Sequence, residues 1–174
     1  MLYRITDILA KYSRSYLLLV TSLSLSVYIF YYLNVELVPK VTNGRMLDSF
    51  IAGYTAEEGL AELDKFTRYE RSLYKSMYAD GYDVVLPFTI AGVLLSLQAF
   101  SYPLFNTKPF KLLMFIPLLY MISDLSENFV HYQVLVMYEN GATRQQKLNY
   151  LFYGGWFDLF KYITFCKCYY NDQA

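Results

Sequence analysis

The chain has 174 residues, of which 56% are apolar and 20% aromatic, and its 15 basic and 15 acidic side chains cancel to zero net charge. This apolar fraction is higher than that of an ordinary soluble domain, and it predicts an integral membrane protein. The charge is balanced without a basic block, which argues against nucleic acid as a partner.

The length suffices for a single helical membrane domain over residues 1–174. At about 20 residues per span, the chain can hold four spans and one sizeable polar segment. We therefore expect an all-α membrane protein with four transmembrane helices and one amphipathic extramembrane helix.

Residues 1–14 place apolar side chains at helical spacing between basic ones, which predicts a short helix on the membrane surface. The segment is also similar to the start of a mitochondrial targeting segment, except that it contains Asp7. Residues 15–35 carry no charge and predict the first span. Ser22 and Ser26 lie one helical turn apart within it, so they predict a small face for close packing on another helix.

Residues 36–83 form the one large polar segment. Within it, Thr55 and Glu58 have the spacing of a capping box, in which two side chains satisfy free backbone N–H groups at a helix start. Apolar residues then recur at steps of three and four. This pattern predicts an amphipathic extramembrane helix over about residues 55–79.

Residues 84–106 are uncharged and predict the second span, with Pro87 in its first turn, where a missing N–H does no harm. Gly92 and Ser96 are expected to form its small packing face. A polar turn at residues 106–109 then leads to the next span.

Residues 111–138 predict the third span, in which Pro117 is expected to kink the helix. Residues 148–166 predict the fourth span, which is rich in aromatic side chains. Asp158 and Lys161 lie three residues apart on one face of this span, so they can pair and make their burial tolerable.

The middle of the third span carries Asp124, Glu127 and His131 at positions i, i+3 and i+7, with Asn128 beside them. This spacing places them on one face of the helix. They are expected to face protein, because each charge exposed to lipid costs about 3 kcal/mol or more. If the extramembrane helix folds back over the bundle, Arg71 is the expected cation, since a guanidinium group can hold two carboxylates.

Three interpretations of this cluster stay open: a buried knot that fixes helix packing, a site for a ligand or a proton, and a metal site. A metal fits the pattern less well, because di-iron helices use Glu-x-x-His and this chain has a single histidine. Cys166 and Cys168 lack the C-x-x-C spacing of zinc or redox sites and are expected to be free thiols. We assign no catalytic, cofactor-binding or metal-binding residue, and expect bound lipids at most.

Several short motifs follow one another in the chain. They are Tyr54-Thr-Ala-Glu57-Glu58, Glu70-Arg71, Tyr74, Asp83-x-x-x-Pro87 and Asp124-x-x-Glu127-Asn128. Their order, over about residues 48–129, resembles a pattern in small four-helix membrane proteins of bacteria and eukaryotes, a family without an assigned activity. The resemblance implies one structural polar cluster of Arg71, Asp83, Asp124, Glu127 and Asn128. His131 and the fourth span lie outside it.

The 20 tyrosines and 13 phenylalanines exceed what a four-helix interior can use, which predicts aromatic surface for neighbouring subunits. The aromatic surface, together with the similarity of residues 1–14 to a mitochondrial targeting segment, favours a non-enzymatic structural accessory subunit. The expected assembly is a mitochondrial inner-membrane complex of the respiratory chain or ATP synthase. The expected partners are other integral membrane subunits and lipids. The alternative is a stand-alone membrane enzyme or transporter that uses the intramembrane Asp/Glu cluster.

Orientation follows from the basic residues of the short flanking segments. These residues concentrate near the N-terminus, at Lys108 and Lys111, and near the C-terminus, whereas the long polar segment is acidic. Both termini are therefore expected on the matrix side.

Overall fold

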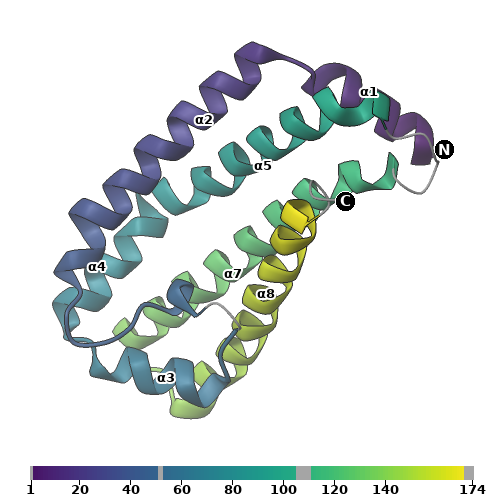
Figure 1. Cartoon of the computed structure of the whole chain (residues 1–174). Helices are drawn as coiled ribbons and strands as arrows, with labels where there is room; N and C mark the ends of the chain where they lie inside the picture. Colours follow the sequence, from purple (N-terminus) through teal and green to yellow (C-terminus); the bar gives the residue numbers. More distant parts are fainter. Residues whose placement is uncertain (1, 51–52, 105–110, 171–174) are drawn as a thin grey trace.

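The computed structural model describes residues 2–50, 53–104 and 111–170, and every regular element within these ranges is helical (Figure 1). Within these ranges, three stretches are long and apolar enough to cross a membrane, namely Tyr16–Lys40, Tyr82–Leu104 and Leu112–Glu139. The chain therefore fits an integral membrane protein, as its composition predicts. The turn expected at residues 106–109, and with it Lys108, lies outside the described residues.

The N-terminal helix α1 (Leu2–Ser13) is followed at once by α2 (Tyr16–Tyr31), which Ser15 caps through a hydrogen bond from the Leu18 backbone N–H. Beyond α2 the chain stays helical as a π-helix (Tyr32–Leu37) and a 3₁₀ turn (Val38–Lys40). The first membrane stretch is therefore longer than the 15–35 span that its lack of charge predicts.

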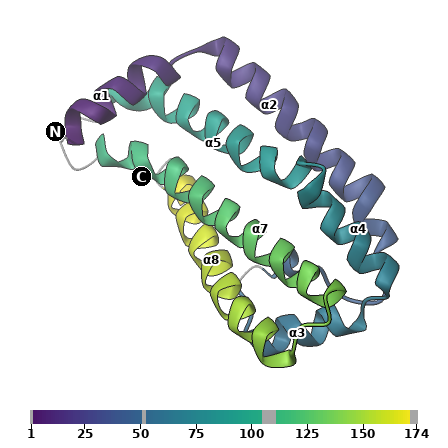
Figure 2. The same ribbon diagram turned by 180° about the vertical axis from the view of Figure 1, so that it is seen from behind.

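Helix α2 packs along α5 (Tyr82–Ser101) through small side chains, as their spacing predicts (Figures 1 and 2). The Ser26 hydroxyl donates a hydrogen bond of 2.8 Å to the Thr89 hydroxyl. At Gly92 there is no room for a side chain, because an added Cβ would lie 2.6 Å from the Ser22 Oγ. Close approach of the two backbones thus depends on this glycine.

Alanine at position 92 tests this contact. We expect Gly92→Ala to destabilise the protein by about 1 kcal/mol through overpacking, and Ser22→Ala to relieve most of the loss in the double variant because the crowded Oγ is gone. Unfolding titrations in detergent measure both. Additive effects of the two substitutions would contradict the contact.

Pro87 lies inside α5 and not in its first turn, because the helix already begins at Tyr82. The prediction for Pro87 is wrong in this respect. A proline has no N–H, so the carbonyl group four residues earlier, that of Asp83, cannot receive the usual helical hydrogen bond. This carbonyl needs another donor, which the candidate site provides.

The single helix expected over residues 55–79 is two helices, α3 (Ala56–Lys65) and α4 (Arg68–Ala79). The capping box of Thr55 and Glu58 is confirmed. A second capping box, Thr67 with Glu70, begins α4 and accounts for the break. The apolar periodicity runs across the break, so it cannot by itself reveal where one helix ends.

Glu70 also fastens the segment after the first membrane stretch to α4. Its carboxylate accepts hydrogen bonds from the backbone N–H groups of Thr42 and Asn43, at 2.7 and 3.0 Å, and from the Asn43 side chain, at 2.9 Å. The hydrogen bonds from the Asn43 side chain and from the Thr67 backbone are the main reasons why the pKa of Glu70 lies well below its usual value.

This lowered pKa predicts a pH dependence. The contribution of Glu70 is present above the pKa of an unfolded glutamate, about 4.3, and is lost as the pH falls from there through the folded pKa. We expect wild type to exceed Glu70→Gln in stability at pH 7, and the difference to shrink below about pH 4. Denaturant titrations across pH measure it, with the exposed Glu57→Gln as control. A difference in stability between wild type and Glu70→Gln that stays constant down to pH 3 would contradict this role of Glu70.

The last two helices, α7 (Ile116–Glu139) and α8 (Arg144–Tyr170), run antiparallel and side by side (Figures 1 and 2). Pro117 lies in the first turn of α7, after a 3₁₀ turn (Leu112–Phe115), so the expected kink inside a longer helix is wrong. Helix α8 begins before residue 148 and is not among the three stretches apolar enough to span. The side chains of Cys166 and Cys168 lie outside the described part.

Candidate functional site

Lys161 of α8 lies at the centre of a group of carboxylates from α7 and α8. Its Nζ is 2.5 Å from the Glu127 Oε2, 3.3 Å from the Asp124 Oδ1 and 3.3 Å from the Asp158 Oδ1. We call these four residues the ion cluster. Asp158 and Lys161 pair as their spacing on α8 predicts, and the same lysine reaches across to α7.

The ion cluster is enclosed. Glu127 and Asp158 are completely buried, and Asp124 and Lys161 are each 8% exposed. The inward orientation predicted for Asp124 and Glu127 is therefore confirmed. Charges removed from water in this way are tolerated only when they are paired, so Lys161 is what permits three carboxylates to lie between the helices.

Arg71 is not the cation of this cluster, contrary to expectation. Its guanidinium group donates hydrogen bonds to the carbonyl groups of Leu63 and Phe66 and lies over the Tyr138 ring, with 4.9 Å from Cζ to the ring centroid. It therefore closes the end of α3, where the last carbonyl groups lack the usual helical donor four residues further on. The expectation fails because α3 ends at Lys65, which leaves carbonyls beside Arg71 that attract its N–H groups.

Asn128 and Asp83 meet through the backbone. The Asn128 side-chain amide donates a hydrogen bond of 2.6 Å to the Asp83 carbonyl, the group that Pro87 leaves without a helical donor. This contact joins α5 to α7 and satisfies the Asp83 carbonyl group near the start of the second membrane stretch. Asp83 and Asn128 thus lie together, as the motif resemblance implies, and Arg71 lies apart.

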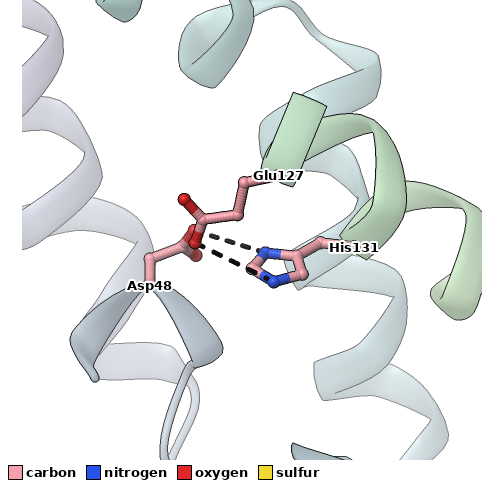
Figure 3. Close-up of side chains that lie close together, drawn as sticks. All are labelled: Asp48, Glu127 and His131. Atoms are coloured by element: carbon pink, nitrogen blue, oxygen red, sulfur yellow. Dashed lines mark ion pairs between the residues drawn. The ribbon is translucent and has the colours of Figure 1, made fainter. Parts of the chain in front are cut away.

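His131 joins the ion cluster to the polar segment before α3 (Figure 3). Its Nε2 is 2.6 Å from the Tyr54 hydroxyl, and its Nδ1 is 3.2 Å from the Tyr78 hydroxyl and 3.4 Å from the Asp48 Oδ1. Its Nε2 is also 3.9 Å from the Glu127 Oε1, which is beyond hydrogen-bonding distance. The ring is completely buried.

Asp48 belongs to a 3₁₀ turn (Leu47–Ser49) that enters the bundle beside α4 and α7. The hydroxyl groups of Tyr74 and Tyr78 donate to its Oδ2 at 2.7 and 3.1 Å. Burial raises the pKa of Asp48, but His131, Lys161 and Tyr74 outweigh it and hold the pKa below its ordinary value. Burial, and next the charge of Asp48, raise the pKa of both tyrosines, so they remain protonated donors.

Tyr54 packs closely against glycines of α3 and α8. Its ring lies against Gly59, its hydroxyl against Gly154 and its carbonyl against Gly155, so a Cβ at any of the three would clash with it. The hydroxyl that reaches His131 is thus placed by close contacts of Tyr54 with glycines on two helices.

Sequence reasoning missed Asp48 and the role of Tyr54, Tyr74 and Tyr78. Tyr54 and Tyr74 stand among the short motifs singled out in the sequence, and this position could have marked them. Asp48 carries no periodic or motif signal, because it lies in an irregular segment whose path depends on tertiary contacts.

Two surface hollows lie beside α8, and neither is lined by a residue of the ion cluster, by Asp48 or by His131, although Tyr54 and Gly155 border the first. One, of about 670 Å³, includes Glu57, Gln145 and Trp156, and the other, of about 700 Å³, includes Ile122, Phe129 and Tyr153. Comparison with protein-family models, with curated proteins and with solved structures gave no match to this chain.

Proposed function

We propose that the protein is a non-catalytic structural subunit of a larger integral membrane complex. The observation that carries this proposal is the enclosure of the ion cluster. Glu127, which the alternative of an enzyme or transporter would use, and Asp158 are completely buried and held by a lysine of the same chain. Their geometry suits the locking of α7 to α8 better than it suits turnover of a substrate.

Exposed aromatic surface supports the assembly part of the proposal. Along α8, Phe152, Tyr153, Trp156 and Phe160 are all exposed large apolar side chains. Helix α2 buries only Ser22 and Ile29 among its 16 residues. Aromatic residues of this kind are enriched in the centres of subunit interfaces.

The proposal includes a finer topology. Helix α8 is the fourth span, because it accompanies α7 and turns Asp158 and Lys161 toward it. Helices α3 and α4 then lie outside the bilayer, and both termini lie on the matrix side of the mitochondrial inner membrane, where the basic flanks belong. Respiratory-chain and ATP synthase complexes are the candidate assemblies.

Native purification tests this function. Extracted in a mild detergent, the protein is expected to migrate in a native gel with other membrane subunits, at a mass well above its own 20.5 kDa. Mass spectrometry of the band identifies those partners, and cell fractionation tests the mitochondrial location. A 20.5 kDa chain that runs alone would contradict the proposal.

A double variant separates a packing role from a catalytic one. If the carboxylates lock helices, Asp124→Asn with Glu127→Gln reduces the amount of protein incorporated into the complex. If the two carboxylates instead take part in catalysis or transport, as in the alternative of a membrane enzyme or transporter, the variant still assembles. The complex that contains it then loses its catalytic or transport activity. That second outcome would overturn the non-catalytic assignment.

A further inference from the structure

The structure points to a second role for part of this region: we propose that Asp48, Glu127 and His131 bind a divalent transition-metal ion such as Zn²⁺. One ligand atom from each of the three lies within 4.8 Å of the others, and the side chains converge from the 3₁₀ turn and α7 (Figure 3). The inference goes beyond the proposed structural function and does not depend on it.

Each carboxylate already uses one oxygen and leaves the other toward the histidine. Asp48 accepts from Tyr74 and Tyr78 at Oδ2, and its Oδ1 faces His131. Glu127 pairs with Lys161 through Oε2, and its Oε1 is completely buried without a hydrogen-bond partner. A buried carboxylate oxygen left in this state is costly, and a cation bound at Oε1 removes the cost.

The surrounding groups act as the supports that metal ligands need. A metal-bound histidine commonly uses its second ring nitrogen in a hydrogen bond that fixes the ring. Tyr54 provides that contact at Nε2, at 2.6 Å, which leaves Nδ1 facing Asp48. Tyr78 can retain its hydrogen bond to Asp48 if Nδ1 binds the metal.

Distances and charge favour a metal ion. Ligand atoms around a tetrahedral ion with bonds of about 2.1 Å lie about 3.4 Å apart. The separation of 3.4 Å between the His131 Nδ1 and the Asp48 Oδ1 already meets this value. The ligand atoms of all three residues lie within 4.8 Å of one another, so Glu127 has to move closer to complete the site. Four carboxyl groups, those of Asp48 and of the ion cluster, lie around a single ammonium group, so acidic groups are in excess. A divalent ion reduces this excess, and the imidazole with two carboxylates suits Zn²⁺ better than Mg²⁺ or Ca²⁺.

The sequence did not favour a metal because Glu127 and His131, four residues apart on one helix, do not match the Glu-x-x-His pattern of di-iron helices, and the chain has a single histidine. Two ligands at i and i+4 are a common half of a zinc site. The third ligand, Asp48, is 79 residues away from Glu127 in the chain and comes into place only through the fold.

Zinc titration of the full-length protein in lipid nanodiscs tests the site. After removal of metal with a chelator, wild type is expected to bind one equivalent of Zn²⁺, and Asp48→Asn and His131→Gln to weaken binding at least tenfold. Asp158→Asn removes a charge from the same region without removing a ligand, so it is expected to bind within about threefold of wild type. Equal losses in all three variants, or wild type without stoichiometric zinc, would overturn the proposal.

X-ray absorption spectroscopy of the wild-type zinc complex keeps the test decisive even if a variant fails to fold. The proposal requires nitrogen and oxygen ligands, with the signature of one imidazole ring. Sulfur ligands would assign the zinc to Cys166 and Cys168 and refute the site.

Discussion

Replacing Lys161 by methionine is expected to destabilise the protein by about 3–5 kcal/mol, the cost of breaking a buried ion pair by removing one partner. Methionine retains much of the apolar part of the lysine side chain, so the loss of stability comes mainly from removal of the positive charge. Lys161 is 8% exposed and lies within 3.3 Å of the Asp124, Glu127 and Asp158 carboxylates. Unfolding titrations in detergent measure the difference.

Two further variants check that the loss comes from unpaired charge. Lys65→Met removes an exposed pair with Glu62, in which the lysine side chain is 53% exposed, and should cost about 0–1 kcal/mol. Adding Glu127→Gln to Lys161→Met is expected to restore part of the stability, because one buried charge without a partner is removed. A double variant less stable than Lys161→Met would contradict this account of the ion cluster.

Gly155→Ala is expected to destabilise the protein by about 1–3 kcal/mol through overpacking. In an isolated helix the same change adds about 1 kcal/mol of stability, so the sign of the effect distinguishes packing from helix propensity. The Cβ would clash with the carbonyl oxygen of Tyr54, and a backbone atom cannot move aside as a flexible side chain can.

Gln145→Ala, at an exposed position of the same helix, is the control and should change stability by no more than about 0.5 kcal/mol. Both variants are compared with wild type in the same unfolding assay. Stabilisation by Gly155→Ala would show that Tyr54 is not seated against α8 as described.

Local chemistry predicts most of the helices and part of the site. Apolar composition marks the three membrane stretches, the Thr55 capping box marks the start of α3, and the polar face of α7 marks Asp124 and Glu127 as buried. The i, i+3 spacing on α8 also predicts the pair of Asp158 and Lys161. Each of these signals depends on neighbours in sequence.

What sequence reasoning missed depends on distant contacts. Arg71 was expected at the carboxylates, but it donates hydrogen bonds to carbonyl groups at the end of α3. Asp48 reaches His131 only because the irregular segment before α3 enters the bundle. The interior position of Pro87 explains after the fact why Asn128 is needed at the Asp83 carbonyl.

The most direct test of the central claim, that Lys161 is enclosed between α7 and α8 as the partner of three carboxylates, is its reactivity toward an amine-modifying reagent. In the folded protein in nanodiscs, mass spectrometry is expected to find Lys161 unmodified while the exposed Lys65 is fully modified, and Lys161 should become reactive after unfolding. Modification of Lys161 in the folded protein at the rate of Lys65 would contradict the account.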